Sequence, residues 1–277
     1  MHPLISIVIP TYNVFYYIRE ALQSIIDQTL DFRLLEVLLV DDVSTDGTER
    51  IIDEYADRYN NFAAIHLNEY SRGAGKPRNT GMEAASAPYI MFLDGDDRFC
   101  DDACEQLYNA IETYRSDVVC GRIEKIEEED YVLLPVYGRL FPKEVINTTI
   151  ESTPKFIITP PAVWSRIYRR NFLQENNIRF PEGIIAQDAV FAIEVFLKAE
   201  TISYIPVTVG RFRKGRSKGE PSITQIVTPD FIQDLSTARK IMIDLFNHSG
   251  TLDSFSTLYQ ESLKSFLLDL IAYHQQN

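Results

Sequence analysis

An acidic run, Asp94-Gly95-Asp96-Asp97, follows a short apolar segment and could hold a divalent cation. Mg²⁺ and Mn²⁺ prefer hard oxygen ligands and often bridge phosphate oxygens with only one or two protein carboxylates. Two carboxylates separated by one glycine can point toward the same ion while the backbone stays close to a ligand. A solvent-exposed acidic turn is the alternative. We favour Asp94 and Asp96 as metal ligands because a buried strand is predicted directly before them.

A second segment, residues 71–79, combines two glycines with three cations. It is not a dinucleotide fingerprint, because Arg78 stands where the third glycine should be, and it is not a P-loop, because Pro77 follows Lys76. A glycine-rich loop that leads into a helix and carries Lys76 and Arg78 still suits a diphosphate. An ordinary surface loop is the alternative.

The sequence alone does not decide the roles of two further features. Asp188 opens a predicted helix beside apolar residues, where burial could tune its pKa for base catalysis. From the residues alone, an aspartate that only interacts with the helix dipole is the better explanation. The densest positive cluster includes Arg213, Lys214 and Arg216. It could close over donor phosphates, hold an anionic acceptor, or be a solvated loop.

The elements that must position these residues alternate between strands and helices in the first half. Buried strands are predicted at 5–9, 36–40, 62–67, 89–93 and 117–123, with amphipathic helices between them. This order is typical of a mainly parallel sheet flanked by helices, which binds ligands at the carboxyl ends of its strands. Those ends carry the polar clusters 11–13, 41–42 and 94–97.

The second half is less regular. Residues 124–130 are predicted as a solvated acidic loop or strand edge, and residues 141–165 as a long connection. A helix is expected over 187–199, then strands at 202–205 and 208–212, and helices from 230 to the end.

Composition excludes several classes of protein. The formal net charge of −13 is opposite to what binding of nucleic acid requires. Three cysteines without zinc-like spacing indicate reduced thiols in a cytosolic protein. We find no signal peptide and no run of the roughly 18 apolar residues that a membrane span needs. Peripheral membrane association through a local basic patch stays open.

Four motifs, in order, resemble family 2 glycosyltransferases of the GT-A fold. They are Ser6–Asn13, Val40–Thr48, Arg78–Gly81 and Phe92–Asp97. The resemblance spans residues 4–225. The run Gly75–Asn79 further resembles bacterial enzymes that decorate wall teichoic acid or related cell-surface polymers, often with N-acetylglucosamine.

The resemblance implies a role for each matching position. Pro10, Thr11, Tyr12 and Asp42 would hold uridine, with Asp41 nearby. Arg78 would contact the diphosphate, and Asp94 with Asp96 would contact the ribose and the metal. Asp188 matches the catalytic base of a Glu-Asp motif, in which Gln187 here replaces the glutamate. Pro221 stands where many relatives carry a histidine, so closure over the phosphates would rely on Arg213, Lys214, Arg216 or Lys218.

We therefore expect an α/β GT-A enzyme with an acceptor-side subdomain and C-terminal helices. Residues 1–225 would form the catalytic domain, with a nucleotide-binding half (1–115) and an acceptor half (116–225), and residues 226–277 a helical segment. The expected reaction is inverting, Mn²⁺- or Mg²⁺-dependent transfer from a UDP-sugar to a hydroxyl of a glycan or polyol-phosphate acceptor. The expected location is the cytoplasm, including the inner face of the membrane. A sugar-nucleotide nucleotidyltransferase and a non-catalytic carbohydrate-binding module are the alternatives.

Overall fold

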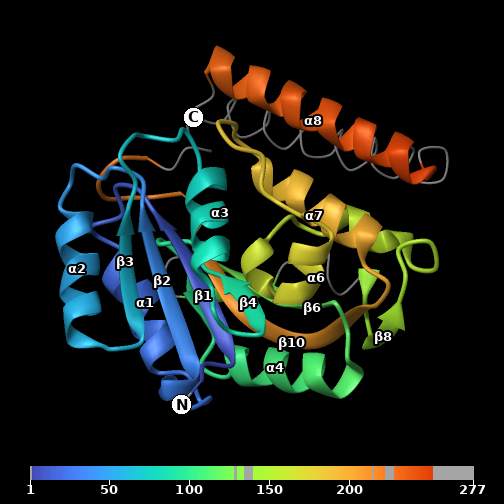
Figure 1. Cartoon of the computed structure of the whole chain (residues 1–277), viewed down its shortest axis with the longest axis horizontal. Helices are drawn as coiled ribbons and strands as arrows, with labels where there is room; N and C mark the ends of the chain where they lie inside the picture. Colours follow the sequence, from blue (N-terminus) through green and yellow to red (C-terminus); the bar gives the residue numbers. More distant parts are fainter. Residues whose placement is uncertain (1, 128–129, 134–139, 214, 222–227, 252–277) are drawn as a thin grey trace.

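A computed structural model describes residues 2–127, 130–133, 140–213, 215–221 and 228–251. The first half alternates strands and helices as predicted (Figure 1). Its strands are β1 (Ile5–Thr11), β2 (Leu35–Asp41), β3 (Phe62–His66) and β4 (Tyr89–Phe92). The helical segments are α1 (Ile18–Ile26), η1 (Phe32–Leu34), α2 (Thr48–Arg58) and α3 (Gly75–Ala84). The four strands are parallel in the order β3-β2-β1-β4, so their carboxyl ends lie at one edge of the sheet.

The second half adds mixed strands to the same sheet. Its strands are β5 (Arg98–Phe99), β6 (Val118–Glu127), β7 (Asp130–Leu133), β8 (Val145–Thr148), β9 (Arg166–Arg169) and β10 (Ile202–Arg213). Its helical segments are α4 (Ala103–Tyr114), η2 (Pro154–Ile158), η3 (Val163–Ser165), α6 (Arg170–Glu175), α7 (Gln187–Lys198) and α8 (Pro229–Ser249). The order in the described sheet is β3-β2-β1-β4-β9-β6-β10-β5, with β7 beside β6 and β8 beside β10.

Strand β1 shows why the sheet is covered on both faces. Ile5, Ile7 and Ile9 pack in a core cluster with buried residues of α1, α2 and α4. Val8 points to the opposite face and belongs to a second cluster with buried residues of α6, α7 and α8. Successive side chains of a strand point to opposite faces, and both sets are apolar because helices cover both.

The acidic stretch 124–130, predicted as a solvated loop or strand edge, is largely the end of β6. Three details of the second half differ from the prediction. The expected connection at 141–165 contains β8 and two 3₁₀ helices, η2 and η3. The two strands expected at 202–212 are one strand, β10, whose register with β6 shifts around Thr208. Strand β9 was not expected and lies antiparallel between β4 and β6. The mainly parallel α/β sheet with flanking helices is nevertheless confirmed.

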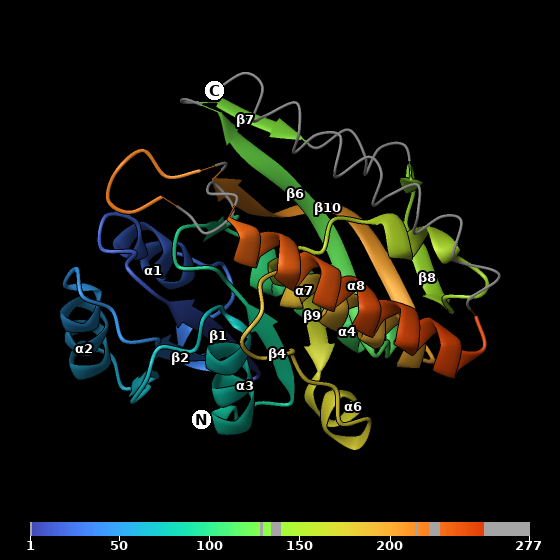
Figure 2. The same ribbon diagram turned by 90° about the horizontal axis from the view of Figure 1, so that it is seen from above.

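Helix α8 lies across α7 (Figure 2). Its Asp234 carboxylate is buried and accepts a hydrogen bond from the Ile185 backbone N–H at 3.2 Å, and it lies 3.3 Å from Arg72. These contacts fix the start of α8 to the loop before α3 and to the segment before α7. The predicted helix beyond residue 251 lies outside the described residues. In the described part of the chain, no helix is both long and apolar enough to cross a membrane.

Candidate active site

The loops after β1 and β2 are joined into one polar surface. The Asn13 backbone N–H donates to the Ser44 hydroxyl at 3.1 Å, and the Asn13 side chain accepts from the Thr45 N–H at 2.9 Å. Asp41 accepts from the Ser44 hydroxyl at 2.5 Å and from the Thr11 hydroxyl at 3.2 Å. The buried Asp41 therefore organises these loops from below and does not itself line the cavity.

Asp42 and two tyrosines form one end of a cavity above these loops. Asp42 is buried and accepts from the Ser71 backbone N–H at 2.8 Å and from its hydroxyl at 2.9 Å. Burial raises the pKa of Asp42, and the hydrogen bonds from Ser71 oppose this rise. The rings of Tyr12 and Tyr70 lie 4.7 Å apart at 35° and are both partly exposed. Flat rings beside a carboxylate offer stacking and hydrogen bonding to a base or ribose.

Helix α3 carries a buried arginine into the centre of the site. Arg78 is only 3% exposed, and its guanidinium donates to Gln187 Oε1 at 2.8 Å and to Asp94 Oδ1 at 2.5 Å. It also lies 5.2 Å from the centre of the Phe180 ring. Two hydrogen-bonding partners and an aromatic face fix its direction, as a group that recognises phosphate requires.

The neighbouring residue, Asn79, ties α3 to the segment that leads to α7. Its side-chain amide donates to the Phe180 carbonyl at 2.9 Å and accepts from the Phe180 N–H at 2.9 Å. At the start of α3, a Cβ atom on Gly75 would lie 2.1 Å from the Pro181 carbonyl oxygen. Only glycine allows this close approach. The run Gly75–Asn79 therefore holds α3 against the segment that leads to Asp188.

The acidic turn after β4 is paired with arginines. Asp96 Oδ2 lies 2.7 Å from Arg216 Nε, and these two side chains are 17% and 13% exposed. Asp97 accepts from the Arg213 backbone N–H at 2.8 Å. Burial, together with the neighbouring carboxylates of Asp96 and Asp94, raises the pKa of Asp97. The turn thus concentrates negative charge that needs cations beside it.

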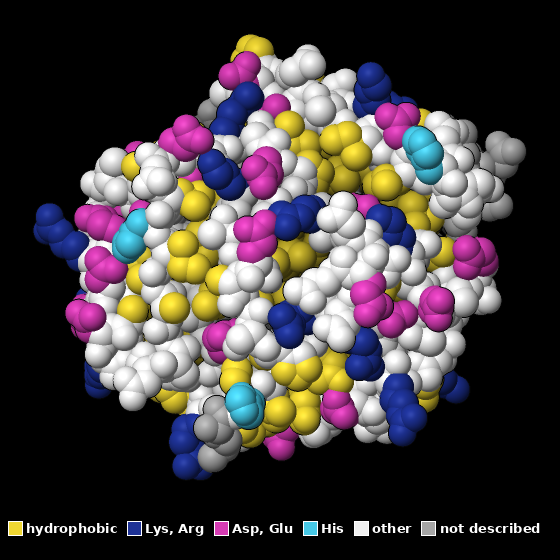
Figure 3. All heavy atoms as spheres, in the orientation of Figure 1, with side chains coloured by type: hydrophobic (Ala, Val, Ile, Leu, Met, Phe, Trp, Pro, Cys, Tyr) yellow, Lys and Arg dark blue, Asp and Glu magenta, His cyan; other side chains and the backbone are white. Residues whose placement is uncertain are grey.

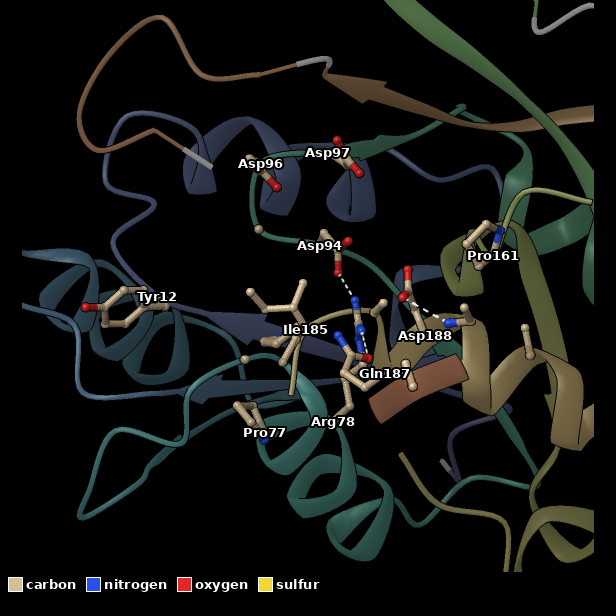
Figure 4. A pocket seen from close by; sticks show the side chains of 18 of the residues that line it. Tyr12, Pro77, Arg78, Asp94, Asp96, Asp97, Pro161, Ile185, Gln187 and Asp188 are labelled. Carbon is tan, nitrogen blue, oxygen red and sulfur yellow. Dashed lines mark hydrogen bonds and ion pairs between the residues drawn. The ribbon is translucent and has the colours of Figure 1, made fainter. Parts of the chain in front are cut away.

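Asp188 lies in the first turn of α7, across the cavity from this acidic turn (Figure 4). The residue before the helix, Ala186, has φ 63°, a left-handed conformation that non-glycine residues rarely adopt. Burial raises the pKa of Asp188, Arg78 lowers it, and Asp94 raises it. One carboxylate oxygen accepts from the Ala189 N–H at 2.9 Å. A carboxylate with a raised pKa at a cavity wall can accept a proton from a substrate hydroxyl.

One cavity of about 740 Å³ unites these groups. The predicted site residues that line it are Pro10, Thr11, Tyr12, Asp42, Arg78, Asp94, Asp96, Asp188, Arg213 and Arg216. Asp41 and Lys76 do not line it; Lys76 Nζ instead lies 3.1 Å from Glu69. Lys214 lies outside the described residues. In Figure 4, Tyr12 lies at one side of the cavity, Asp188 and Pro161 at the other, and Asp94 between them.

The oxygen ligands at the acidic turn fit a hard divalent cation. Asp94 and Asp96 supply two carboxylates at the cavity wall, which is the number that Mg²⁺ often takes from protein when phosphates complete its shell. Among the described residues, no three His, Cys, Asp or Glu side chains are grouped as a self-contained metal site. A cation here would depend on ligands from the bound diphosphate and from water.

Sequence reasoning missed several residues of this cavity. Tyr70 lies in the described loop before α3, and its partnership with Tyr12 across 58 positions gave no local signal. Gln187 was noted only as a replacement for glutamate, whereas its amide oxygen fixes Arg78. The apolar lining from η2 and α8 was also missed.

The sequence of this chain is similar to those of known proteins. The sequence model of the family described as "Glycosyl transferase family 2" matches residues 6–176. Poly(ribitol-phosphate) beta-glucosyltransferase of Bacillus spizizenii is 34% identical over 206 residues, which are 72% of this chain and 30% of that protein. Poly(ribitol-phosphate) beta-N-acetylglucosaminyltransferase TarS of Staphylococcus aureus is 28% identical over 249 residues, which are 87% of this chain and 40% of that protein. The chain thus spans well under half the length of these relatives.

The fold of the chain is also similar to that of a relative whose structure is known. A crystal structure of S. aureus TarS in complex with UDP-GlcNAc superposes with a TM-score of 0.79 at 26% identity, and the match covers 95% of this chain and 73% of that chain. A further crystal structure of the same protein, in complex with UDP, gives a TM-score of 0.74.

Proposed function

The chain belongs to glycosyl transferase family 2, and we propose that it transfers a sugar from a UDP-sugar to an acceptor hydroxyl of a cell-surface polymer or glycan. The sugar is a hexose or N-acetylhexosamine, and N-acetylglucosamine is the first candidate. Support for this comes from the relatives named poly(ribitol-phosphate) glycosyltransferases and from the superposition on a UDP-GlcNAc complex. Residues 1–115 form the donor half and residues 116–225 the acceptor half, and the reaction takes place in the cytoplasm or at the inner face of the membrane.

The observation that carries the proposal is the meeting of three distant chain segments in one cavity. The β1 loop, the acidic turn after β4 and the start of α7 all line it. We assign uridine to the end with Tyr12 and Asp42, the diphosphate to Arg78 and Arg216, and the transferred sugar to the space between Asp94 and Asp188. A divalent cation held by Asp94 and Asp96 would neutralise charge on the leaving diphosphate.

The reaction is a single in-line displacement. Asp188 accepts the proton of the acceptor hydroxyl while that oxygen forms a bond to the anomeric carbon. The bond between the anomeric carbon and the diphosphate oxygen breaks, and UDP leaves with the electron pair. The attacking oxygen approaches opposite the leaving group, so the configuration inverts. Arg78 and Arg216 stabilise the negative charge that grows on UDP, because fixed guanidinium groups need little reorganisation as the reaction proceeds.

Replacing the base tests this assignment. Loss of a general base typically lowers the rate about 10²- to 10⁴-fold. Asp188→Asn should therefore nearly abolish UDP release in the presence of acceptor while UDP-sugar binding, measured by calorimetry, persists. The melting temperature should not fall, because burial opposes the charged carboxylate that the change removes.

The matched control is Asp57→Asn, at an exposed position of α2, which should leave turnover unchanged. Normal turnover by the Asp188→Asn variant would remove this residue from the mechanism. Absence of UDP release by the unaltered protein from every UDP-sugar and acceptor would overturn the proposed function as a whole.

A further inference from the structure

One side chain of α8 differs in chemistry from the rest of the face that this helix buries. The buried residues of α8 are Phe231, Asp234, Ala238, Met242 and Phe246. They recur every three or four positions, so they share one face of the helix. Four of them are apolar, whereas Asp234 carries a charge although the residue is only 4% exposed. A carboxylate in an otherwise apolar face loses hydration and needs partners that compensate for it.

Asp234 has two partners, one in the loop before α3 and one in the turn before α7. Its Oδ2 atom accepts from Arg72 Nη2 at 3.3 Å and from the Ile185 backbone N–H at 3.2 Å. The Arg72 side chain is 44% exposed, so water screens its pair with Asp234. Figure 3 shows acidic and basic side chains next to one another at several places on this face, and such surface pairs stabilise a fold little. The hydrogen bond from Ile185 is therefore the contact that needs an explanation.

The turn that contains Ile185 leads directly to the proposed base. The next residue, Ala186, has φ 63°, a conformation that costs free energy in any residue other than glycine and persists only where the surrounding structure enforces it. Gln187, which accepts from Arg78, and Asp188 follow at once. The direction in which both side chains enter the cavity therefore depends on this turn.

Two elements hold the turn in place. In the loop before α3, a Cβ atom on Gly73 would lie 2.9 Å from the Ile184 carbonyl oxygen, so the loop and the turn are in close contact. In α8, Asp234 accepts the Ile185 N–H. The close contact leaves the turn little room on the side of the loop, and the hydrogen bond ties it to α8. Removal of the carboxylate would release this tie.

We propose that Asp234 is a positioning residue of the reaction: by holding the Ile185 N–H, it fixes the turn from which Asp188 enters the cavity. A role in stability alone explains the carboxylate poorly, because apolar side chains can often replace a buried charged pair without loss of stability. The inference rests on the proposed function. It also makes α8 part of the active site, although the sequence predicts a catalytic domain that ends at residue 225.

Two substitutions of Asp234 separate positioning from packing. Asp234→Asn keeps an oxygen that can accept the Ile185 N–H, whereas Asp234→Ala removes the acceptor. We would measure kcat and KM for UDP release, with UDP-GlcNAc as donor and poly(ribitol phosphate) as the probe acceptor. Because a small misplacement of a catalytic group costs up to about a hundredfold in rate, Asp234→Ala should lower kcat about 10- to 100-fold. The KM for UDP-GlcNAc should stay the same, and Asp234→Asn should retain most of the activity.

The same helix offers two matched controls. Asp230 is 81% exposed and lies 3.7 Å from Arg72, so Asp230→Ala removes the other acidic partner of this arginine and should leave kcat unchanged. Phe246 is buried on the same face, about three turns beyond Asp234. Phe246→Leu should lower the melting temperature without lowering kcat at 25 °C. Normal kcat in Asp234→Ala overturns the inference, and so does an equal loss of kcat in Asp234→Asn or Phe246→Leu.

Amide hydrogen exchange tests the same contact without turnover. Peptides that cover residues 183–190 should exchange faster in Asp234→Ala than in the unaltered protein, because local opening of the turn becomes easier. The same peptides should exchange at the unaltered rate in Asp234→Asn and Phe246→Leu. Unchanged exchange in Asp234→Ala overturns the inference. Absence of UDP release by the unaltered protein would instead count against the proposed function, and the exchange rates would then decide whether Asp234 holds the turn.

Discussion

The ion pair between Arg216 and Asp96 makes a prediction about metal binding that does not depend on turnover. Asp96 is one of the two proposed metal ligands, and its carboxylate lies 2.7 Å from Arg216 Nε, with both side chains less than one fifth exposed. Arg216 also donates to the Asn13 carbonyl at 3.2 Å, which holds it over the acidic turn. A cation that binds Asp96 must displace or weaken this pair. Arg216→Gln should therefore make the binding of the metal alone stronger.

The size of the effect follows from the geometry. A hydrogen bond between charged groups contributes roughly 1.5–3 kcal/mol. Because the pair is partly exposed, water screens it, and the lower limit applies. A change of about 1.4 kcal/mol corresponds to tenfold in affinity, so Mn²⁺ should bind Arg216→Gln about ten times more tightly than the unaltered protein. The affinity for UDP at saturating Mn²⁺ should fall by a similar factor, because the variant lacks the Arg216 guanidinium that is proposed to contact the diphosphate.

The opposite signs of the two changes make the assay decisive. Mn²⁺ binding would be measured by electron paramagnetic resonance without nucleotide, and UDP binding by calorimetry with saturating Mn²⁺. The control is Arg19→Gln, which breaks a 2.7 Å ion pair with Glu54 on the exposed surface of α1 and α2. It should change neither affinity, since exposed pairs contribute little. If both affinities fall in Arg216→Gln, the arginine supports the structure of the turn and does not compete with the cation.

Three further outcomes are expected. Burial raises the pKa of Asp188, and a base must be ionised to accept a proton. The value of kcat should therefore fall as the pH is lowered, and the fall should begin at a higher pH than an ordinary aspartate would give. A pH–rate profile in which kcat does not fall at acidic pH contradicts this. Gly75→Ala should lower the free energy of unfolding in urea by about 1–3 kcal/mol, because the new Cβ meets the Pro181 carbonyl; unchanged stability would mean that α3 and its neighbour separate freely. Lys76→Ala should change the affinity for UDP less than about threefold, because Lys76 pairs with exposed Glu69 outside the cavity lining. A larger loss of affinity, measured by calorimetry, would mean that Lys76 contacts the diphosphate.

The first half of the chain, which is the proposed donor half, could be predicted from the sequence because the signals for its strands and polar clusters are local. A buried strand followed by a polar cluster places that cluster at the carboxyl edge of a parallel sheet, whatever the rest of the chain does. This reasoning predicted that Tyr12, Asp42 and Asp94 lie at one edge of the sheet, and in the structure all three line one cavity.

The proposed acceptor half could not be predicted as well, because contacts between distant parts of the chain determine its elements. Strand β9 contains Arg166, whose charged side chain breaks the apolar pattern of a central strand. In the structure Arg166 is buried, and its guanidinium lies 4.8 Å from the centre of the Phe196 ring. Strand β8 has no buried face that a period of two could reveal; its pairing with β10 decides its conformation. Tertiary contacts override the local pattern in both strands.

The balance of charge in the site also could not be predicted from the sequence. It explains why glutamine at position 187 is compatible with catalysis. Arg78 pairs with one carboxylate, Asp94, and with the neutral amide of Gln187. A second carboxylate at position 187 would neutralise the guanidinium further and add a negative charge next to Asp188. Both changes would make ionisation of Asp188 harder, because Arg78 is the charge that lowers its pKa against burial. The neutral residue therefore keeps the positive charge of Arg78 available to the proposed base, Asp188, and to the diphosphate that Arg78 is proposed to bind.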